Sequence, residues 1–299
     1  MVSRATEAHR ATARAVVHML IEQCGCRIVA LAEVRRENVL EWVPEAVRRD
    51  WDAIADVSGE QHDFDVAILH DRRLLREATE PTWVSSYHAR QRVRAGLVTT
   101  FDVSDGRAPL TLAVAHWRSD ARNHADGSDR RSKAAESLRV AIAAQVRDFG
   151  GDAAPVLVLG DFNAEPFDPP FGAGLPAARF RDVVRRFRSR APDDLLFYNA
   201  AWRWLGEREP WDGAERPASI AGTYRTDKNE PTAWRTFDQV LGSPALLGES
   251  GWCLDERALG VHDGGQLFVR ESSCIRKPFD HLPVVGHLRW LTPGKTSGE

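Results

Sequence analysis

Two polar side chains with complementary chemistry stand at the end of an apolar run, VLVLGDFN, at positions 156–163. Asp161 and Asn163 are two residues apart, so in a strand that persists to its tip their side chains point the same way, while Phe162 points opposite and packs. A carboxylate can accept a proton from water or bind a metal ion, and a neighbouring carboxamide can donate a hydrogen bond to a phosphoryl oxygen. Hydrolysis of a phosphate ester requires both functions.

Other acids and histidines also stand where apolar runs end or begin. They are Glu33 after IVALA, His116 after LTLAVA, Asp238 at the head of DQVLG, and Asp280 with His281 just before PVVGHL. Polar residues are easily accommodated at solvent-exposed strand ends, so each one alone has an ordinary structural explanation. Sites are also built on loops that a rigid scaffold positions. The combination with Asp161 and Asn163 therefore favours a functional site.

The elements that must position these side chains follow from the apolar patterning. We expect helices over 7–23, 132–149 and 178–188, and strands over 26–34, 63–71, 93–103, 109–117, 156–162, 235–243 and 283–290. The Asp-Gly pair in SDGRA, between the strands expected over 93–103 and 109–117, is a hairpin signal. Strands in hairpin and crossover arrangements, interleaved with helices, predict an α/β sandwich of two packed sheets flanked by helices.

Length and composition are consistent with one large domain. The chain has 299 residues with 43% hydrophobic content and no internal repeat or linker, so we expect a single domain over 1–299 with frayed ends at 1–8 and 291–299. A formal net charge of -3 excludes a global basic field. No apolar run reaches membrane-spanning length and none resembles a leader, which predicts a cytoplasmic protein without a membrane anchor.

Four cysteines are present, at positions 24, 26, 253 and 274, without the paired spacing of a zinc site or the density of a disulfide scaffold. Zinc binding through Cys24 and Cys26 is the alternative that we weigh least. We interpret the cysteines as small residues of the core in a reducing compartment.

Taken in order, these motifs resemble the endonuclease/exonuclease/phosphatase superfamily, which includes deoxyribonuclease I, abasic-site endonucleases, sphingomyelinases and inositol polyphosphate 5-phosphatases. The resemblance runs from about 33 to about 288 and rests on ALAEVRRENV, AVAHWRSD, LGDFNAEP, FDQVLGS and FDHLPVV. It implies a deoxyribonuclease I-like fold, a four-layer α/β sandwich of two mixed β-sheets flanked by helices. It also implies metal-dependent hydrolysis of phosphate esters. The segment LLFYNAAWRWLGE looks like a bacterial branch of this superfamily with no assigned substrate.

The resemblance implies a role for each catalytic candidate. Asp161 would orient and deprotonate the attacking water, and Asn163 would hold that water or the phosphoryl group in line. His281 would contact the scissile phosphate, with Asp238 fixing its orientation and raising its pKa. His116 resembles the family's other histidine, a candidate general acid for the leaving oxygen.

The resemblance likewise implies a divalent cation, Mg²⁺ or Mn²⁺, with Glu33 as its main ligand and Asp280 assisting at the metal or the phosphate. One departure concerns this site. Members of the family usually open with a strand that bears an asparagine near the metal, whereas the first asparagine here is Asn38, after the Glu33 motif. We therefore expect the opening strand to be displaced downstream or missing.

The substrate is less defined than the reaction. Arg118 beside His116, and the basic run 179–190, could bind phosphates, although the run could equally be a solvated helix face that buries Val183, Val184 and Phe187. Tryptophans also gather in the Gly/Pro-rich region that follows, at positions 202, 204 and 211. They could stack on a base, although such residues more often cap a core.

Three functions remain open. A nuclease acting on nucleic acid comes first, because basic and aromatic residues accompany the motifs and the spellings EVR and GDFNAEP lie nearest the deoxyribonuclease-like members. A phosphomonoesterase or a small-molecule phosphodiesterase, acting on a nucleotide, an inositol phosphate or a lipid head group, is second. The third is a catalytically weak binding module of the same fold, suggested by the absent asparagine. Whether the protein has protein partners is unknown from the sequence.

Overall fold

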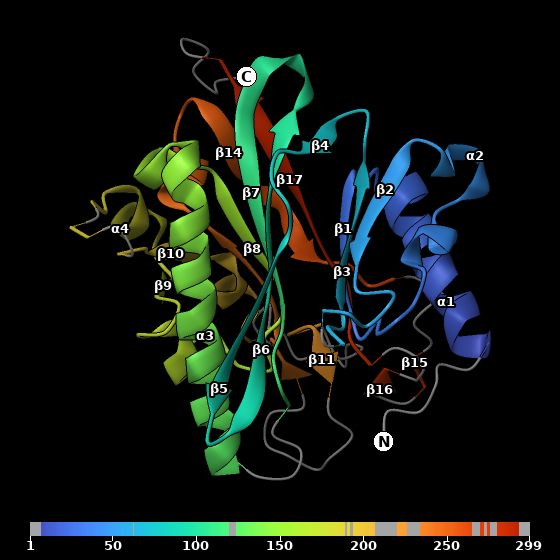
Figure 1. The fold of residues 1–299 in the computed structure, drawn as a ribbon, viewed down its shortest axis with the longest axis horizontal. Helices are drawn as coiled ribbons and strands as arrows, with labels where there is room; N and C mark the ends of the chain where they lie inside the picture. Colours follow the sequence, from blue (N-terminus) through green and yellow to red (C-terminus); the bar gives the residue numbers. More distant parts are fainter. Residues whose placement is uncertain are drawn as a thin grey trace, which may run out of the picture.

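Four layers make up the protein in the computed structural model (Figure 1): helix α1 (Glu7–His18), a small sheet, a large sheet and helix α3 (His124–Val146). The described residues are 7–61, 63–119, 124–188, 190–191, 194–206, 220–225, 234–264, 270–271, 274–275 and 280–292. Of the ends expected to be frayed, 1–8 and 291–299, residues 1–6 and 293–299 lie outside these ranges, whereas 7–8 begin the first helix and 291 ends the last strand. In Figure 1, α1 covers the right side of the sheets and α3 the left.

The large sheet has eight strands. Seven are paired in the order β4 (Leu75–Glu77), β6 (Gln91–Val103), β7 (Arg107–His116), β8 (Val156–Asp161), β13 (Asp238–Gly242), β10 (Phe197–Asn199) and β9 (Ala177–Ala178), and β5 (Thr82–His88) also pairs with β6. Strands β7 and β8 run parallel, and β8 and β13 run antiparallel. Asp161 consequently lies in register with His116 on one side and with Asp238 on the other.

The remaining strands form smaller sheets. The three-stranded sheet has the order β1 (Ile28–Ala32), β3 (Val66–Asp71), β2 (Trp51–Ala55), and three pairs follow: β14 (Gly251–Val261) with β17 (Val284–Leu291), β11 (Tyr224–Arg225) with β12 (Trp234–Arg235), and β15 (Arg270–Glu271) with β16 (Cys274–Ile275).

The α-helices are α1 (Glu7–His18), α2 (Glu45–Arg48), α3 (His124–Val146) and α4 (Arg181–Arg185), and a π-helical turn, η1 (Met19–Gln23), extends α1. Short 3₁₀ turns are η2 (Val39–Trp42), η3 (Ser104–Gly106), η4 (Arg147–Phe149), η5 (Gly151–Ala153), η6 (Pro169–Phe171), η7 (Ala200–Trp204) and η8 (Pro244–Leu247). None of the helices in the described ranges is long and apolar enough to cross a membrane.

Alternation along the strands builds the layers. In β7, Leu112 and Val114 face the core between the two sheets, whereas Ala113 and Ala115 face α3. In β3, Ile68 enters the core between the sheets. Successive residues of a strand point to opposite faces, so a continuous apolar run fills two cores at once.

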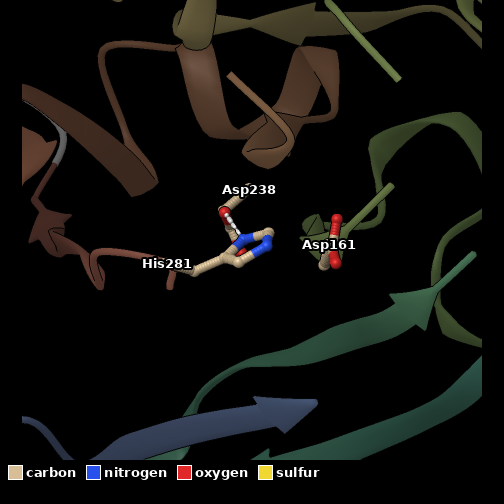
Figure 2. A group of neighbouring side chains, drawn as sticks. All are labelled: Asp161, Asp238 and His281. Atoms are coloured by element: carbon tan, nitrogen blue, oxygen red, sulfur yellow. Dashed lines mark hydrogen bonds and ion pairs between the residues drawn. The ribbon is translucent and has the colours of Figure 1, made fainter. Parts of the chain in front are cut away.

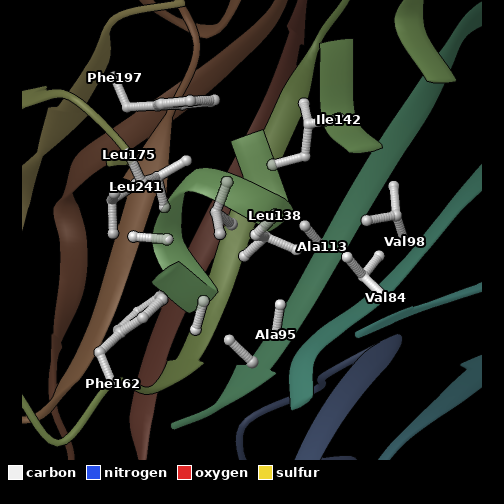
Figure 3. Packing of buried hydrophobic residues seen from close by; sticks show 14 of the residues in the cluster. Val84, Ala95, Val98, Ala113, Leu138, Ile142, Phe162, Leu175, Phe197 and Leu241 are labelled. Atoms are coloured by element: carbon white, nitrogen blue, oxygen red, sulfur yellow. The ribbon is translucent and has the colours of Figure 1, made fainter. Parts of the chain in front are cut away.

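Helix α3 packs on the outer face of the large sheet. Leu138 and Ile142 project from it onto small residues of the strands, among them Ala95 and Ala113 (Figure 3). Small side chains on the sheet let the helix approach closely, and each fully buried leucine or isoleucine contributes about 1.5–3 kcal/mol through its apolar area. The same helix forms the crossover that makes β7 and β8 parallel.

The predicted fold, two packed sheets flanked by helices, is confirmed. The hairpin at SDGRA is present as β6 and β7, with Asp105 in the left-handed region at φ 73°. The helix predicted over 178–188 is wrong in extent, because α4 covers only Arg181–Arg185 and leaves Val183 exposed while Val184 is buried. In the described chain α1 precedes β1, so no asparagine-bearing strand precedes Glu33 there.

Candidate active site

The candidate site lies where β7, β8 and β13 end or begin, because their register brings His116, Asp161 and Asp238 to the same edge of the large sheet. His281 joins them from the chain segment just before β17, and its backbone forms a bridge with Tyr224. Four of the residues expected from the sequence therefore meet at one place. Three of them, Asp161, Asp238 and His281, offer ligand atoms within 4.8 Å of one another (Figure 2).

The turn after β8 holds Asp161 and Asn163 together, although not by the strand geometry that the spacing suggested. Strand β8 ends at Asp161, and Asn163 is left-handed at φ 46°. The Asn163 backbone N–H donates to Asp161 Oδ1 at 2.9 Å, and its side-chain Nδ2 donates to Asp161 Oδ2 at 3.0 Å and to the carbonyl of Trp117 at 2.9 Å. The carboxamide thus orients Asp161 and ties the loop after β7 to the loop after β8.

Buried aromatic rings anchor these two loops from below. Phe162 is fully buried, as predicted, and its ring lies 4.8 Å from that of Trp117, which in turn stacks on Phe171 at 5.8 Å. Trp117 Nε1 donates to the carbonyl of Ala95 at 2.9 Å. His116 and Asp161 immediately precede two of these anchors, Trp117 and Phe162, and therefore stand on a rigid base, as precise catalysis demands.

His281 lies between two carboxylates (Figure 2). Its Nδ1 is 2.7 Å from Asp238 Oδ2, the pairing that the resemblance implied, and the carboxylate of Asp161 lies on its other side. Burial disfavours the imidazolium, but Asp238 and then Asp161 outweigh burial and raise the pKa of His281 to about 10. The ring is thus a cation and a hydrogen-bond donor at neutral pH.

Neighbouring residues that the sequence did not single out position this pair. The ring of Tyr224 lies 4.9 Å from that of His281, and Thr223 Oγ1 accepts a hydrogen bond from the backbone N–H of Asp238 at 3.0 Å. The Thr223 carbonyl accepts from the N–H of Leu282 at 2.7 Å. One short segment therefore holds both members of the pair, and nothing in its local sequence, AGTYRT, indicates this.

His116 has its own acidic partner, Asp65, which immediately precedes β3. His116 Nδ1 is 3.3 Å from Asp65 Oδ2, and His116 Nε2 is 3.7 Å from Asp161 Oδ2. Burial works against the imidazolium, yet Asp65 and Asp161 raise the pKa of His116 to about 9. Arg94 also contacts Asp65, at 3.3 Å. Asp65 is not among the site residues predicted from sequence, although its place just before the apolar run VAILHD resembles that of the predicted ones.

Asp161 is the most deeply placed acid of the group. Loss of hydration and the nearby Asp238 raise its pKa to about 6, against the opposing influence of His281 and His116. A carboxyl group with a pKa near neutrality can both hold and release a proton under physiological conditions, which is the property required of a general base.

Glu33 and Asp280, the expected metal ligands, lie at the rim of the site and are exposed. Glu33 follows β1 with a left-handed backbone at φ 61°, and its charge helps to raise the pKa of His116. The charge of Asp280 acts on His281 in the same way.

Each of these carboxylates has the chemistry of a ligand for a hard divalent cation, although the group of described residues whose ligand atoms lie within 4.8 Å of one another, Asp161, Asp238 and His281, contains neither. Neither makes an ion pair with a described residue, and exposed carboxylate oxygens are the ligands that Mg²⁺ and Mn²⁺ prefer. The imidazole of His281, in contrast, is occupied by Asp238 and protonated, so it is a poor ligand.

Arg118 lies near the site, whereas the run 179–190 lies toward the opposite end of the large sheet, where α4 contacts η8 after β13. Arg118 is exposed, and its carbonyl accepts a hydrogen bond from Arg131 at 3.4 Å. The run 179–190 surrounds a shallow hollow of about 590 Å³, lined by Arg186, Phe187, Arg188, Arg190 and Asp194. Of the three tryptophans, Trp204 belongs to the buried core, Trp202 is half-buried and Trp211 lies outside the described residues.

Known proteins resemble this chain in sequence and in fold. Residues 6–189 match the model of the Endonuclease/Exonuclease/phosphatase family, which is more than half of the chain. No curated protein matches the sequence.

Solved structures show the same fold at low sequence identity. The human Nocturnin catalytic domain with bound sulfate anion is 16% identical, with 97% of this chain and 89% of that chain covered and a TM-score of 0.56. The D. rerio TDP2 complexed with single strand DNA product is 15% identical, with 94% and 93% covered and a TM-score of 0.56. A Bacteroides thetaiotaomicron mannosyl-6-phosphatase is 14% identical, with 96% of each chain covered and a TM-score of 0.58.

A sequence match over 6–189 that contains Glu33, His116, Asp161 and Asn163, together with a shared fold over nearly the whole chain, leaves one assignment. The chain belongs to the endonuclease/exonuclease/phosphatase family of metal-dependent phosphoesterases.

Proposed function

We propose that this protein is a divalent-metal-dependent nuclease that cleaves phosphodiester bonds by in-line attack of an activated water. The observation that carries the proposal is the convergence of Asp161, His281 with its partner Asp238, and His116 with its partner Asp65 at one edge of the sheet. Hydrolysis of a phosphodiester needs a base for the attacking water, a cationic donor for the phosphoryl oxygens and an acid for the leaving oxygen, and this group of residues supplies all three.

Asp161 acts on the water. Its two carboxylate oxygens are held by the backbone and side chain of Asn163, so the direction of the base is set before substrate binds. The sequence suggested that the Asn163 side chain donates to a phosphoryl oxygen. In the structure its Nδ2 group donates to Asp161 and to the carbonyl of Trp117. Asn163 is therefore a positioning residue for Asp161 in this proposal.

His281 stabilises the phosphoryl group. Asp238 holds the ring through Nδ1 at 2.7 Å, which leaves Nε2 to donate to a nonbridging oxygen as negative charge develops. His116, paired with Asp65, donates a proton to the leaving oxygen, so that the water proton taken by Asp161 is balanced by one delivered to the product.

Glu33 and Asp280 would hold Mg²⁺ or Mn²⁺ at the rim. A divalent ion bound there supplies positive charge that offsets the negative charge of the phosphoryl oxygens in the transition state. Since both carboxylates are exposed, the site can exchange its ion with the medium.

Support for a polymeric substrate comes from exposed arginines. Arg118 lies next to His116, and the run 179–190 presents further arginines toward the opposite end of the large sheet, where α4 packs on η8. Exposed guanidinium groups away from the reacting centre suit a substrate with phosphates beyond the one that is cleaved.

The test is a panel of substrates with one active-site variant. Plasmid DNA, single-stranded DNA, RNA and small phosphate mono- and diesters are incubated with Mg²⁺, Mn²⁺ or EDTA, using the parent protein and Asp161→Ala. Asp182→Ala, which removes an exposed acid of α4, is the matched control. We expect metal-dependent cleavage of nucleic acid that Asp161→Ala reduces by about a hundredfold or more and Asp182→Ala leaves unchanged. Release from small esters alone would contradict the nuclease proposal and favour a phosphatase.

A further inference from the structure

Three aromatic rings and one arginine form a connected cluster outside the catalytic group. The ring of Phe167 lies 6.1 Å from that of Trp202, and the Arg179 guanidinium lies 5.7 Å from the Trp202 ring and 4.4 Å from the Phe180 ring. We call Phe167, Arg179, Phe180 and Trp202 the aromatic platform. Its members come from three separate segments, the loop after β8, the approach to α4, and η7.

The platform is a surface and not the cap of a core. Phe167 is 61% exposed and Phe180 is 57% exposed, whereas Trp204, two residues after Trp202, is only 8% exposed. One aromatic residue of this region therefore lies in the core, and others remain in solvent. Each Å² of apolar area left exposed loses about 25 cal/mol of the stabilisation that burial would give. Exposed aromatic groups gathered in one place indicate a binding surface.

Arg179 distinguishes this cluster from a simple apolar patch. It is exposed and makes no ion pair with a described residue, while nearby arginines are neutralised: Arg181 and Arg203 both pair with Glu256, at 3.0 and 3.2 Å. The uncompensated cation rests on aromatic faces, which leaves the edge of the guanidinium free to meet an anion. The surface thus combines apolar rings with one positive charge.

The platform lies close to the catalytic group along the chain. Phe167 is four residues after Asn163, and a turn, in which the N–H of Asp168 donates to the carbonyl of Glu165 at 2.9 Å, shortens the path between them. Even a fully extended chain of four residues spans no more than about 14 Å, the length of a few nucleotides. A strand whose phosphate lies at Asp161 can therefore reach the platform with a neighbouring base.

We propose that the aromatic platform binds the bases of a single-stranded polynucleotide next to the scissile phosphate, with Phe167, Trp202 and Phe180 stacking on bases and Arg179 contacting the backbone. The inference rests on the proposed nuclease function and assigns it a substrate class. Stacking requires unpaired bases, so a single strand is the polymer that this surface accommodates. Because every base has an aromatic face, the contact tolerates sequence and contributes affinity without base specificity.

The binding test avoids catalysis. Parent protein, Phe167→Ala and Arg179→Ala are titrated in EDTA with a fluorescently labelled single-stranded oligodeoxynucleotide, and with an abasic oligomer that keeps the phosphates but lacks the bases. The matched control is Arg107→Ala, whose guanidinium lies 5.5 Å from the Trp252 ring at the opposite end of β7 from His116. Phe167→Trp restores an aromatic ring, and circular dichroism verifies the fold of each variant.

We expect Phe167→Ala to raise the dissociation constant of the base-bearing oligomer about tenfold and to leave the abasic oligomer unaffected. Arg179→Ala weakens binding of both oligomers, because it acts on the phosphates, and Phe167→Trp restores parental affinity. Arg107→Ala changes neither. With Mn²⁺ present, hydrolysis of a small diester by the platform variants equals that of the parent, because the catalytic group is intact.

Three outcomes that overturn the platform are distinguishable. If the parent binds and cleaves single strands but the platform variants do so equally well, the platform assignment is wrong and the nuclease proposal stands. If the parent cleaves only small esters, the nuclease function fails, and with it the polynucleotide platform. A loss of affinity for a sugar phosphate in Phe167→Ala, without any effect on oligomers, would make the platform a sugar site and overturn the proposal.

Discussion

The imidazole of His281 lies between the carboxylates of Asp161 and Asp238, and this arrangement decides its charge. Burial alone would expel the proton, because a desolvated cation is unfavourable. The adjacent acids prevail, and the pKa rises to about 10. At His116 the acids are Asp65 and Asp161, with the same outcome. Each buried imidazolium thus depends on a named carboxylate, which makes the pairs testable one residue at a time.

His281 and Asp238 should behave as one unit in catalysis. We expect His281→Ala and Asp238→Ala each to lower kcat by about a hundredfold or more, and the double variant to lose little beyond the worse single variant, since either change dismantles the same donor. Steady-state kinetics of the four proteins measures this. His287 is an exposed histidine of β17, and His287→Ala serves as the control. Combined with Asp238→Ala, it should give an effect on kcat equal to the product of the two single effects. Multiplicative losses for the first pair would contradict the pairing.

His116 should titrate well above an ordinary histidine. In metal-free protein, NMR should find its pKa at about 9, and Asp65→Asn should lower it toward 6.5, whereas Asp63→Asn, which removes a partner of Arg36, should not. The sign for stability follows from linkage, because a raised pKa means that the folded state binds the extra proton. The stabilisation from His116 is complete below pH 6.5 and is lost as pH rises through about 9. Urea unfolding of His116→Gln should therefore show a smaller decline than that of the parent, and the decline that persists comes from His281, whose pKa is about 10.

At the scale of elements, the close approach of two parallel strands brings His116 beside Asp161. Gly160, at φ 147°, stands where a Cβ atom would overlap the backbone carbonyl of Ala115, the residue paired with it in β7. The absence of a side chain here permits the pairing of the two strands immediately before their catalytic residues. The glycine of the GDFN motif is therefore a structural requirement for the site.

Gly160→Ala should lower the free energy of unfolding by about 3 kcal/mol, because overlap with a backbone atom adds to an unfavourable φ. Gly106→Ala, at φ 68° in the hairpin turn with no neighbouring atom within 4 Å of the new methyl group, isolates the conformational part and should cost about 1 kcal/mol. Urea denaturation measures both. Equal losses in the two variants would show that the contact with Ala115 is not what demands glycine.

At the scale of the whole molecule, three apolar clusters hold the four layers together without help from the active site. One lies between α3 and the large sheet, one between the sheets, and one between α1 and the small sheet. The catalytic group stands at the edge of these layers and contributes charge in place of packing. Removal of the metal should therefore abolish activity and leave the fold intact.

Mg²⁺ should raise the melting temperature modestly through binding to the folded state alone. At about ten times its Kd we expect a rise of about 3 °C in the parent and none in Glu33→Gln, with unchanged melting of both proteins in EDTA. Glu41→Gln, which alters an exposed acid of η2, should keep the full rise. If Mg²⁺ raised the melting temperature of Glu33→Gln as much as that of the parent, Glu33 would not be a ligand of the metal.

The layered fold could be predicted from local patterns. The apolar runs of β3, β7 and β8 and the hairpin signal at SDGRA depend on side-chain alternation and turn chemistry, which act over a few residues and are visible in sequence. The helix over 178–188 failed because its apolar residues alternate between exposed Val183 and buried Val184, which is decided by packing against other elements and not by helical spacing.

The amino-acid sequence by itself determined the identity of the chemical groups, since motifs such as GDFN and DHLP place Asp161, Asn163 and His281 at strand ends whatever surrounds them. Only the tertiary structure decided which side chains contact each other. The pairing of Asp65 with His116, the contact of Tyr224 with His281 and the direction of the Asn163 carboxamide all join segments distant in sequence. Such contacts depend on strand register and loop placement, which are properties of the assembled sheets and have no local signature.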